Sequence, residues 1–333
     1  MDNKNKIKVL PDEKGHFDRY GGKFVPETEA KVSIYDSALM FGDMVFEMTR
    51  SFNKNQFKLR EHLERLYTGI KILQIPLTMT IDEMEEICHE IVKRNEPVFD
   101  THDEHRLMID VSRGPLGIYA PIFGGKLEPT VVIADFPLKW TVASLAQLYE
   151  KGINSVIPSQ RSIPAKLMDP KIKNRSRVWY QMANIEVSKV EGDNNWPLLM
   201  DPDGYITEGT GDNFFMVKNG ELFTPEGRNI LRGVSRAYVF ELAEQLNIPY
   251  HECNIEPYDI YDADEAFLTS TPFCILPTTQ LNRLDIGSGK MGTITKMLLD
   301  KWSENVKVDI VQQIRNYGKE VEFHNKDDSF SPY

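Results

Sequence analysis

The chain is poor in cysteine: its 333 residues include three, Cys88, Cys253 and Cys274, far apart in the sequence. An odd number of cysteines, with no Cys-x-x-C pair and no histidines at matching spacing, argues against a disulfide framework and a structural zinc site. Reduced thiols and a cytoplasmic location are therefore expected. The sequence has no run of about 18 apolar residues, so no membrane span is expected. The polar residues 1–20 have no signal-peptide pattern.

The chain also lacks an excess of basic residues. It has 39 Lys and Arg against 50 Asp and Glu, a formal net charge of −11. This charge argues against nucleic acid as the main partner, because phosphate backbones need clustered cations, but a local basic pocket for a small anion remains compatible with it. A candidate nucleotide motif at residues 287–290 (Gly-Ser-Gly-Lys) is followed by Met291, where a P-loop has Ser or Thr.

What is present is the pattern of an ordinary globular protein of class α+β, with 41% hydrophobic and 27% charged residues. We expect an N-terminal arm (1–20), a smaller N-terminal α+β domain (21–136) and a linker (137–143). A larger, mixed and β-rich domain (144–305) and a C-terminal helix or tail (306–333) follow. The length is sufficient for two domains with cores of their own.

Apolar periodicity predicts two helices in the smaller domain, at 59–73 and 81–94. Thr80 and Glu83 have the spacing of a capping box at the start of the second helix. Strands are expected in this domain at 22–26, 30–34, 46–52, 106–111 and 130–136. In the larger domain the pattern predicts strands at 154–158, 196–200, 205–207, 213–218, 221–224 and 265–269, and helices at 143–151, 175–188, 235–246 and 292–303.

A Lys and a Glu in the larger domain indicate the chemistry. Lys173 lies in a basic stretch, and Glu208 follows 35 residues later in the glycine-rich sequence Thr-Glu-Gly-Thr-Gly-Asp-Asn. A Lys amine forms a Schiff base with an aldehyde, and a carboxylate beside a ring nitrogen favours the protonated ring. Together they point to pyridoxal 5′-phosphate. Taken singly, Lys173 also fits a solvated loop lysine, and Glu208 a solvated turn carboxylate.

A phosphate group would need amides and hydroxyls, and two segments offer them. Gly233, Val234 and Ser235 precede an amphipathic helix, whose N-terminal N–H groups are suited to phosphate. Thr271 follows a predicted strand and adds a hydroxyl. Alternatively, Ser235 is an ordinary N-cap residue and Thr271 an ordinary turn residue.

Taken together, these motifs resemble the class IV (fold-type IV) pyridoxal-phosphate aminotransferases over roughly residues 22–303. Residues 36–47 resemble the family's N-domain signature, and residues 57–66 its His-x-x-Arg-Leu helix. The resemblance is nearest to the branched-chain aminotransferases. The family also includes D-amino-acid aminotransferases, R-selective amine transaminases and aminodeoxychorismate lyase. It implies a cofactor held between the two domains and a homodimer or higher homo-oligomer.

The resemblance also implies roles for single residues. Lys173 becomes the catalytic Schiff-base lysine, with Lys171 as the alternative, and Glu208 faces the ring nitrogen of the cofactor. Arg177 contacts the ring hydroxyl, at a position where branched-chain enzymes usually have Tyr. The implied phosphate ligands are Arg65, Val234, Ser235 and Thr271. Without the resemblance, Arg65 reads as a surface residue paired with Glu61, one helical turn away.

The substrate pocket is expected to be largely apolar, with Arg106 available to a carboxylate. Its candidate residues are Phe41, Phe46, Arg106, Met108, Tyr119, Pro272 and Phe273. Each of them also fits core or loop packing.

The implied reaction is a ping-pong transamination between a hydrophobic, branched-chain-like amino acid and 2-oxoglutarate. The Arg at position 177 leaves open an R-selective amine or D-amino-acid transaminase, and β-elimination by a lyase is a further alternative. A cofactor-binding protein without catalysis is disfavoured, because Lys173 and Glu208 are both present. No metal, nucleic-acid or membrane partner is expected.

Overall fold

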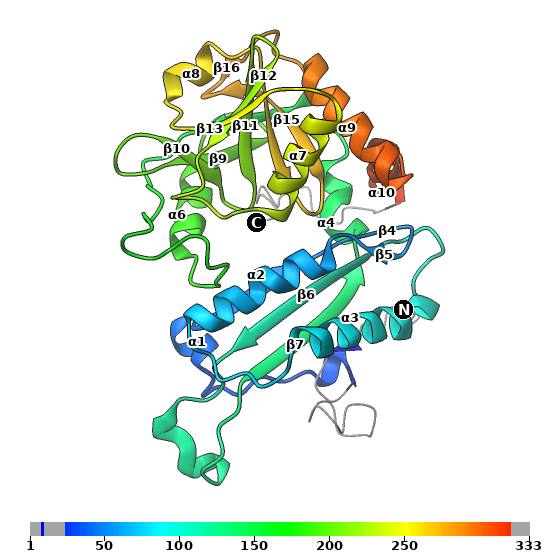
Figure 1. Cartoon of the computed structure of the whole chain (residues 1–333), viewed down its shortest axis with the longest axis vertical. Coiled ribbons are helices and arrows are strands. Elements are labelled where there is room, and N and C mark those ends of the chain that lie inside the picture. The colour runs from blue at the N-terminus through cyan, green and yellow to red at the C-terminus, as the bar shows by residue number, and fades with distance from the viewer. Residues whose placement is uncertain (1–7, 10–23, 321–333) are drawn as a thin grey trace. The chain divides into compact units, whose positions relative to one another are not determined.

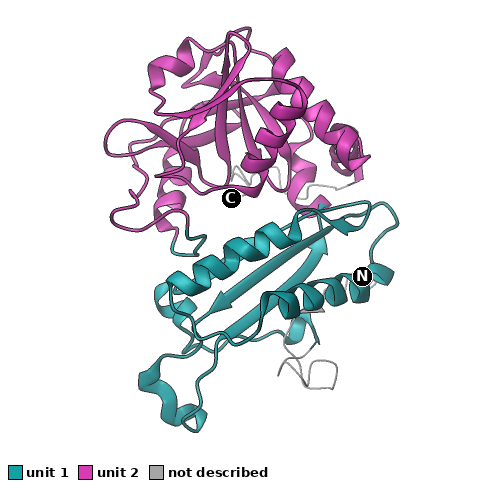
Figure 2. Ribbon diagram, viewed as in Figure 1, with its two compact units in different colours: residues 1–138, 172–176 teal, residues 139–171, 177–333 magenta. Residues whose placement is uncertain are grey.

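The computed structural model describes residues 8–9 and 24–320, and these form two compact units (Figure 2). Unit 1 comprises Met1–Leu138 and Ile172–Ser176, and unit 2 comprises Lys139–Lys171 and Arg177–Tyr333. Apart from Lys8–Val9, the predicted N-terminal arm lies outside the described residues, as does the end of the predicted tail. Within the described ranges, no helix combines the length and the apolar character needed to cross a membrane.

Unit 1 is an antiparallel sheet with two long helices (Figure 1). In spatial order its strands are β2 (Val25–Pro26), β1 (Lys8–Val9), β7 (Thr130–Pro137), β6 (His105–Ser112) and β3 (Met44–Met48). A small hairpin joins β4 (Ser51–Phe52) to β5 (Asn55–Gln56). The helical elements are α1 (Ser37–Phe41), α2 (Leu59–Ile72), α3 (Ile81–Asn95) and the 3-10 turns η1 (Glu27–Glu29), η2 (Glu96–Val98) and η3 (Gly117–Phe123).

The core of unit 1 forms where α2 and α3 pack on the sheet. Leu63 and Leu66 of α2 and Ile87 of α3 are buried in one cluster with Leu107 and Ile109 of β6. The apolar periodicity therefore located both helices and their buried faces correctly. The predicted capping box is also confirmed: Thr80 Oγ accepts from Glu83 N–H, and Glu83 Oε2 accepts from Thr80 N–H.

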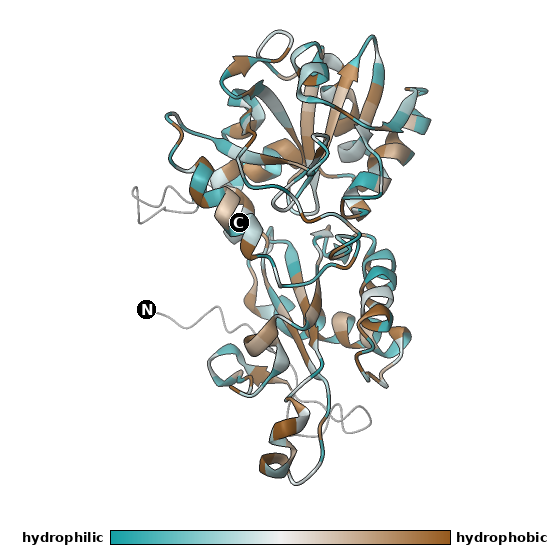
Figure 3. Cartoon of the chain, turned by 90° about the vertical axis from the view of Figure 1, so that its left-hand side faces the viewer, coloured by the Kyte–Doolittle hydropathy of each residue, from teal (hydrophilic) through white to brown (hydrophobic). Residues whose placement is uncertain are grey.

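Unit 2 is built on a nine-stranded mixed sheet. Its order is β10 (Ile206–Gly209), β9 (Asn195–Met200), β8 (Ile153–Val156), β15 (Cys274–Leu281), β14 (Glu265–Ser270), β11 (Asn213–Lys218), β12 (Glu221–Pro225) and β13 (Tyr250–Cys253), with β16 (Leu284–Asp285) on β15. An additional pairing of β10 with β11, through Glu208 and Asn213, closes part of this sheet into a ring. Apolar residues, brown in Figure 3, follow the strands of this sheet.

Helices surround the strands of unit 2. They are α4 (Lys139–Val142), η4 (Ala143–Leu145), α5 (Leu148–Lys151), α6 (Val178–Val187), α7 (Val234–Gln245), α8 (Pro257–Tyr261), α9 (Thr293–Val306) and α10 (Ile310–Glu320). The helix predicted at 143–151 is thus divided into short pieces, and the helix predicted at 175–188 begins three residues later than expected. The residues before it, Ile172–Ser176, belong to unit 1, where Asn174 forms a bridge with Val45.

That segment, Ile172–Ser176, is the main difference in domain organisation, because it carries Lys173 and packs with unit 1. Phe46 N–H donates to the carbonyl of Lys173 (2.9 Å), and Asn174 forms a bridge with Val45. Arg175 makes an ion pair with Asp110 (3.0 Å). Its position in the sequence had predicted Lys173 to belong to the larger domain, whereas these long-range contacts attach it to β3 of the smaller domain.

Two strand predictions were wrong in unit 1. No strand forms at 30–34, where Val32 and Ile34 are more than half exposed, and the expected strand at 46–52 is divided into β3 and β4. In unit 2 the strand β15 was not predicted, and Pro277 lies within it. Proline lacks a donor and is tolerated in sheets at bulges. A register irregularity between Thr278 and Gln280 adjoins Pro277.

Candidate active site

Glu208 is a buried carboxylate on β10, and the groups that donate hydrogen bonds to it include three neutral ones. Tyr180 Oη donates to Oε1 (2.8 Å), while Asn213 Nδ2 (3.0 Å) and Leu231 N–H (2.9 Å) donate to Oε2. Glu208 is 4% exposed, so it is not the solvated turn residue of the alternative interpretation. Hydrogen bonds to a carboxylate favour its ionised form, and neutral donors orient the group without cancelling its charge.

Asp212 lies close to Glu208, but it differs from Glu208 in its hydrogen bonding. It is buried, and its Oδ1 has no hydrogen-bond partner within the described part of the chain. Burial raises the pKa of Asp212 well above its usual range, and the nearby Glu208 raises it further. The surroundings of Asp212 therefore favour its protonated form over its charged form.

The N-terminus of α7 lies beside Glu208. Asn213 Nδ2 also donates to the carbonyl of Leu231 (3.0 Å), which links β11 to the chain entering this helix. Gly233 is the N-cap residue, and no side chain caps the first turn. A Cβ atom on Gly233 would lie 2.1 Å from Asn213 Oδ1, so the close approach needs glycine. Ser235 is buried in the first turn rather than at the N-cap, which removes the simpler interpretation of this serine.

Thr271 lies at the same end of the sheet. It directly follows β14, which pairs with β11 through Thr269 and Asn213. The next contact along this edge is from Ser270 Oγ to the carbonyl of Gly211 (2.8 Å). Unit 2 therefore brings Glu208, the start of α7 and Thr271 to one edge of its sheet.

Arg177 belongs to the same region of unit 2. It precedes α6 as its N-cap residue, and its guanidinium carbon lies 5.2 Å from the centre of the Tyr180 ring, in a cation–π arrangement. Tyr180 therefore contacts both Arg177 and Glu208.

Lys173 lies in unit 1 against Phe46. Its Nζ is 4.8 Å from the centre of the Phe46 ring, and the guanidinium carbon of Arg175 is 3.7 Å from the same ring. Phe46 itself is 5% exposed. The lysine is thus held at both ends: its carbonyl is fixed by β3, and its ammonium lies beside an aromatic side chain.

Arg65 also lies in unit 1, on α2, and is anchored by a fully buried glutamate. Arg65 Nε and Nη2 donate to the two carboxylate oxygens of Glu47 (2.6 and 2.8 Å). His62 Nδ1 lies 2.7 Å from Glu47 Oε2 and donates to it, because an ionised carboxylate only accepts. Glu61, the partner of the alternative interpretation, instead makes an ion pair with Lys58 (3.3 Å).

The electrostatics of this cluster follow from its burial. Burial alone would raise the pKa of Glu47, but Arg65 and His62 outweigh it, so the pKa is held well below its usual range. Burial lowers the pKa of His62, and Glu47 opposes this only in part. Glu47 is therefore ionised and His62 neutral at pH 7.

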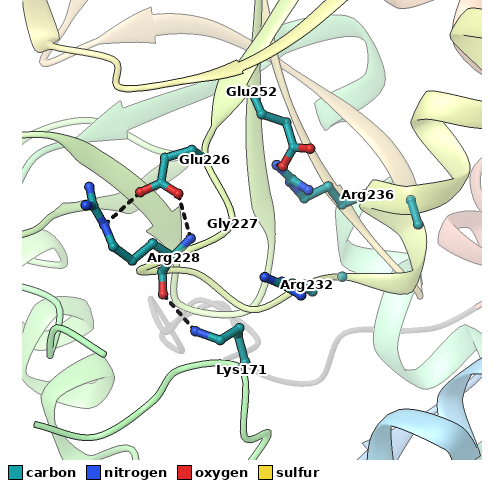
Figure 4. A pocket seen from close by; sticks show the side chains of 9 residues that line it. Lys171, Glu226, Gly227, Arg228, Arg232, Arg236 and Glu252 are labelled. Carbon is teal, nitrogen blue, oxygen red and sulfur yellow. Dashed lines mark hydrogen bonds and ion pairs between the residues drawn. The ribbon is translucent and has the colours of Figure 1, made fainter. Parts of the chain in front are cut away.

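Lys171, the alternative to Lys173, has different surroundings. Its ammonium makes an ion pair with Asp169 (2.8 Å) and donates to the carbonyl of Arg228 (3.0 Å). Figure 4 shows it at a pocket of unit 2 of about 670 Å³, with Arg228, Arg232 and Arg236. Lys171 is thus a side chain of this charged pocket of unit 2.

The substrate residues predicted in unit 1 differ in exposure. Arg106 is 2% exposed, and its Nη2 lies 3.6 Å from Met48 Sδ, while Met48 and Met108 are cross-strand neighbours. Two other candidates are more peripheral. Phe41 is 68% exposed at the end of α1. Tyr119, in η3, has its ring 4.6 Å from that of Tyr35.

Pro272 and Phe273, the candidates in unit 2, are both buried. The Phe273 ring packs edge-on against Trp196 at 5.8 Å, and its carbonyl accepts from Tyr149 Oη (2.6 Å). These contacts match the core packing that the sequence left open as the alternative for Phe273.

The residues that form hydrogen bonds with Arg65 and Glu208 were not identified from the sequence. Glu47 and His62 both lie within motifs already recognised, so their spacing from Arg65 was a usable signal. Asn213 likewise ends the glycine-rich motif of Glu208. Tyr180 had no such signal, because its contact with Glu208 depends on the packing of α6 against the sheet.

These residues fit the groups of pyridoxal 5′-phosphate. A buried carboxylate held by neutral donors suits a protonated ring nitrogen, and an uncapped helix start that requires Gly233 suits a phosphate. Lys173 has an amine of the kind that forms a Schiff base with an aldehyde. The donor set in each unit is thus consistent with the cofactor expected from the sequence.

Comparison with known proteins defines the class. The amino-transferase class IV family matches residues 44–281, and the chain belongs to this family. It is thus a pyridoxal-phosphate-dependent transferase of fold type IV, as expected from its motifs.

Among the proteins similar to this chain are branched-chain amino acid aminotransferases. A Methanocaldococcus jannaschii protein, itself provisionally assigned as a branched-chain-amino-acid aminotransferase, is 35% identical over 85% of this chain and 94% of its own length. The structure of the Escherichia coli branched-chain amino acid aminotransferase is similar with a TM-score of 0.76 and 27% identity, covering 88% of this chain and 92% of that one. The branched-chain enzyme of T.th., in complex with N-(5′-phosphopyridoxyl)-L-glutamate, has a TM-score of 0.76 and 25% identity, covering 96% and 99%.

Proposed function

We propose that this chain transfers the amino group of a hydrophobic, branched-chain-like amino acid to 2-oxoglutarate in a ping-pong reaction. The observation that carries the proposal is the Glu208 carboxylate, which is buried, oriented by Tyr180, Asn213 and Leu231, and adjacent to the glycine start of α7. When bound, pyridoxal phosphate supplies an aldehyde for the amino group and a ring that stabilises negative charge on the substrate.

The roles of the residues follow from their chemistry. Glu208 keeps the ring nitrogen protonated, since a neighbouring negative charge raises the pKa of a base. The N–H groups of Val234 and Ser235 bind the phosphate, together with Thr271. Arg65 adds a charge-assisted contact to the phosphate, with its guanidinium oriented by Glu47.

Lys173 has two roles in the proposal. With the cofactor bound, its Nζ would hold the aldehyde group, and once released by the amino donor it would move a proton to and from the α-carbon of the substrate as a general base. Its position beside the Phe46 ring supports the proposal, because the cation–π contact holds the Nζ atom at a defined place.

The preference for a hydrophobic donor rests on Met48 and Met108, which are partly exposed cross-strand neighbours in unit 1, and on the Phe46 ring of the same strand as Met48. Arg106 is proposed to hold a substrate carboxylate. Arg177 favours a second candidate, an R-selective amine or D-amino-acid transaminase. It is a cation at the proposed ring-hydroxyl position, and it stacks on Tyr180. A lyase would need no amino acceptor and is therefore separable by experiment.

The test is to supply L-leucine, D-alanine or (R)-1-phenylethylamine to the holoenzyme, with and without 2-oxoglutarate. Glutamate formed from L-leucine, with one equivalent of oxo acid released when the acceptor is omitted, is the expected result. Lys173→Ala should abolish turnover, while the matched control Lys171→Ala should retain it. Turnover with D-alanine or the amine alone would select the second candidate. Release of product from aminodeoxychorismate without an acceptor would select the lyase.

We also propose that the chain forms at least a homodimer. Leu39 and Phe41 of α1, and Ile118 and Ile122 of η3, are each more than half exposed, and exposed apolar surface of this kind marks association sites. Sedimentation velocity at micromolar concentration should give a dimer or a larger species, and a monomer would contradict the proposal.

A further inference from the structure

Tyr180 is the side chain that connects two of the proposed cofactor ligands. It is a buried residue of α6, 8% exposed, and its hydroxyl donates to Glu208 Oε1 at 2.8 Å. The other oxygen of Glu208 receives the side chain of Asn213 and the backbone of Leu231. The two oxygens are therefore held from different elements, and α6 reaches Oε1 through the Tyr180 hydroxyl.

We propose that Tyr180 is a positioning residue that holds the Glu208 carboxylate against the ring nitrogen of the cofactor. This inference rests on the proposed function. Asn213 and Leu231 fix one oxygen, and Tyr180 fixes the rotation of the carboxylate about that point. Arg177 packs on the same aromatic ring at 5.2 Å. Tyr180 thus couples the residue proposed at the ring nitrogen to the residue proposed at the ring hydroxyl.

The hydroxyl of Tyr180 acts only as a donor to Glu208. Burial raises the pKa of Tyr180 well above its usual range, the Glu208 carboxylate raises it further, and Arg177 opposes the shift only in part. The phenol is therefore favoured in its protonated form, which can donate to Glu208. Without this donor, the carboxylate would be freer to rotate, and its ionised form would be less favoured relative to the protonated acid.

The proposed role of Tyr180 predicts that the effect of removing its hydroxyl on cofactor affinity depends on the ring nitrogen of the cofactor. Tyr180→Phe keeps the aromatic ring under Arg177 and removes only the hydroxyl. If the hydroxyl acts through Glu208 on the ring N–H, its loss should weaken binding of pyridoxal phosphate and leave binding of an analogue with C–H in place of the ring nitrogen unaffected. One hydrogen bond to a charged group corresponds to about a tenfold change in affinity.

The experiment is an equilibrium titration of apoprotein with pyridoxal phosphate and with this analogue, for wild type, Tyr180→Phe and Tyr238→Phe. Tyr238 is a matched control, because it is a buried tyrosine of the same unit whose hydroxyl contacts Asn305 (3.0 Å). The expected result is about a tenfold weaker affinity of Tyr180→Phe for pyridoxal phosphate, with the affinity for the analogue and both affinities of Tyr238→Phe unchanged.

A second experiment distinguishes the proposed role of Tyr180 from a folding defect in the variant. In a Glu208→Gln background, adding Tyr180→Phe should cause no further loss of affinity for pyridoxal phosphate, since the two residues act as one unit. Equal losses for both ligands, additive losses in the double variant, or no loss at all would each overturn the role of Tyr180. Failure of the wild type to bind pyridoxal phosphate is a different result, because it would overturn the proposed function and this inference with it.

Discussion

Glu47 of unit 1 and Glu208 of unit 2 are both buried carboxylates, yet their surroundings differ in charge. Glu47 is bound by the guanidinium of Arg65 and by His62. Glu208 is bound by a phenol, an amide side chain and a backbone N–H. The comparison indicates that Glu47 is paired with the cationic guanidinium of Arg65, which it orients, whereas these three donors to Glu208 are neutral and do not offset its charge.

The largest expected effect is on stability and comes from Glu47. Glu47→Ala should lower the free energy of unfolding by about 3–5 kcal/mol, because it leaves Arg65 and His62 buried without their shared partner. Urea unfolding measures this loss, with Glu64→Ala as the control. Glu64 is an exposed residue of α2, the helix of Arg65 and His62, and its replacement should change the free energy of unfolding by less than about 0.5 kcal/mol.

The pH dependence of the Glu47 effect has a defined sign. Since the folded-state pKa is lowered, the stabilisation is complete above the usual pKa of glutamate and is lost as the pH falls from there toward the lowered value. The gap between wild type and Glu47→Ala should therefore narrow in acid. A gap that stays constant through the acidic range would show that Glu47 contributes by packing rather than by charge.

Glu208→Gln should produce the opposite pattern, with a large loss of activity and a small loss of stability. The amide keeps the size of the side chain but removes the charge proposed to act on the ring nitrogen, and loss of such an electrostatic contact reduces kcat by about 10²–10³-fold. Steady-state kinetics and thermal unfolding measure the two effects. Glu226→Gln, a partly exposed glutamate of the same unit, should retain activity. Full activity in Glu208→Gln would contradict the proposal that the charge of Glu208 acts on the ring nitrogen of the cofactor.

The parts of the fold that could be predicted are those that depend on local patterns. The spacing of Leu63 and Leu66 defined α2 and its buried face, and Thr80 with Glu83 defined the start of α3. Period and capping are properties of a short segment, so they can be read without knowing what the segment packs against. The strand around Pro277 shows the limit, because local preference argues against a strand that the sheet then accommodates.

The site divides in the same way. Lys173, Arg65 and Glu208 could be proposed from motifs, but the attachment of Lys173 to β3 could not, since Phe46 lies 127 residues earlier in the chain. Tyr180 was not found for the same reason: its contact with Glu208 spans 28 residues and depends on α6 packing. An orienting residue can therefore be predicted where it lies within the motif of the charged residue, as Glu47 and Asn213 do, but not where the contact depends on tertiary packing, as for Tyr180.

Asp212→Asn sharpens the comparison by testing which carboxyl near Glu208 carries the charge. Because the folded-state pKa of Asp212 is raised, the wild type loses stability as the pH rises above the usual pKa of aspartate. The variant mimics the protonated acid and should become more stable than the wild type with rising pH, by at most about 1.4 kcal/mol per pH unit. Melting temperatures across this range measure the difference, and the exposed Asp203→Asn should show none. An unchanged pH profile in Asp212→Asn would mean that Asp212 is already ionised beside Glu208.

Thr80→Ala has the smallest expected effect and separates helix capping from the charge cluster in unit 1. The hydroxyl accepts from Glu83 N–H (3.3 Å) at the start of α3, and losing an N-cap of this kind costs about 1 kcal/mol. Thr80→Ser keeps the acceptor and should retain most of the stability in urea unfolding. Activity should be unchanged in both variants, because neither touches Glu47 or Arg65. A loss from Thr80→Ala as large as that from Glu47→Ala would instead mean that unit 1 depends on its helix ends as much as on its buried ion pair, and that the orientation of Arg65 is not what Glu47 chiefly provides.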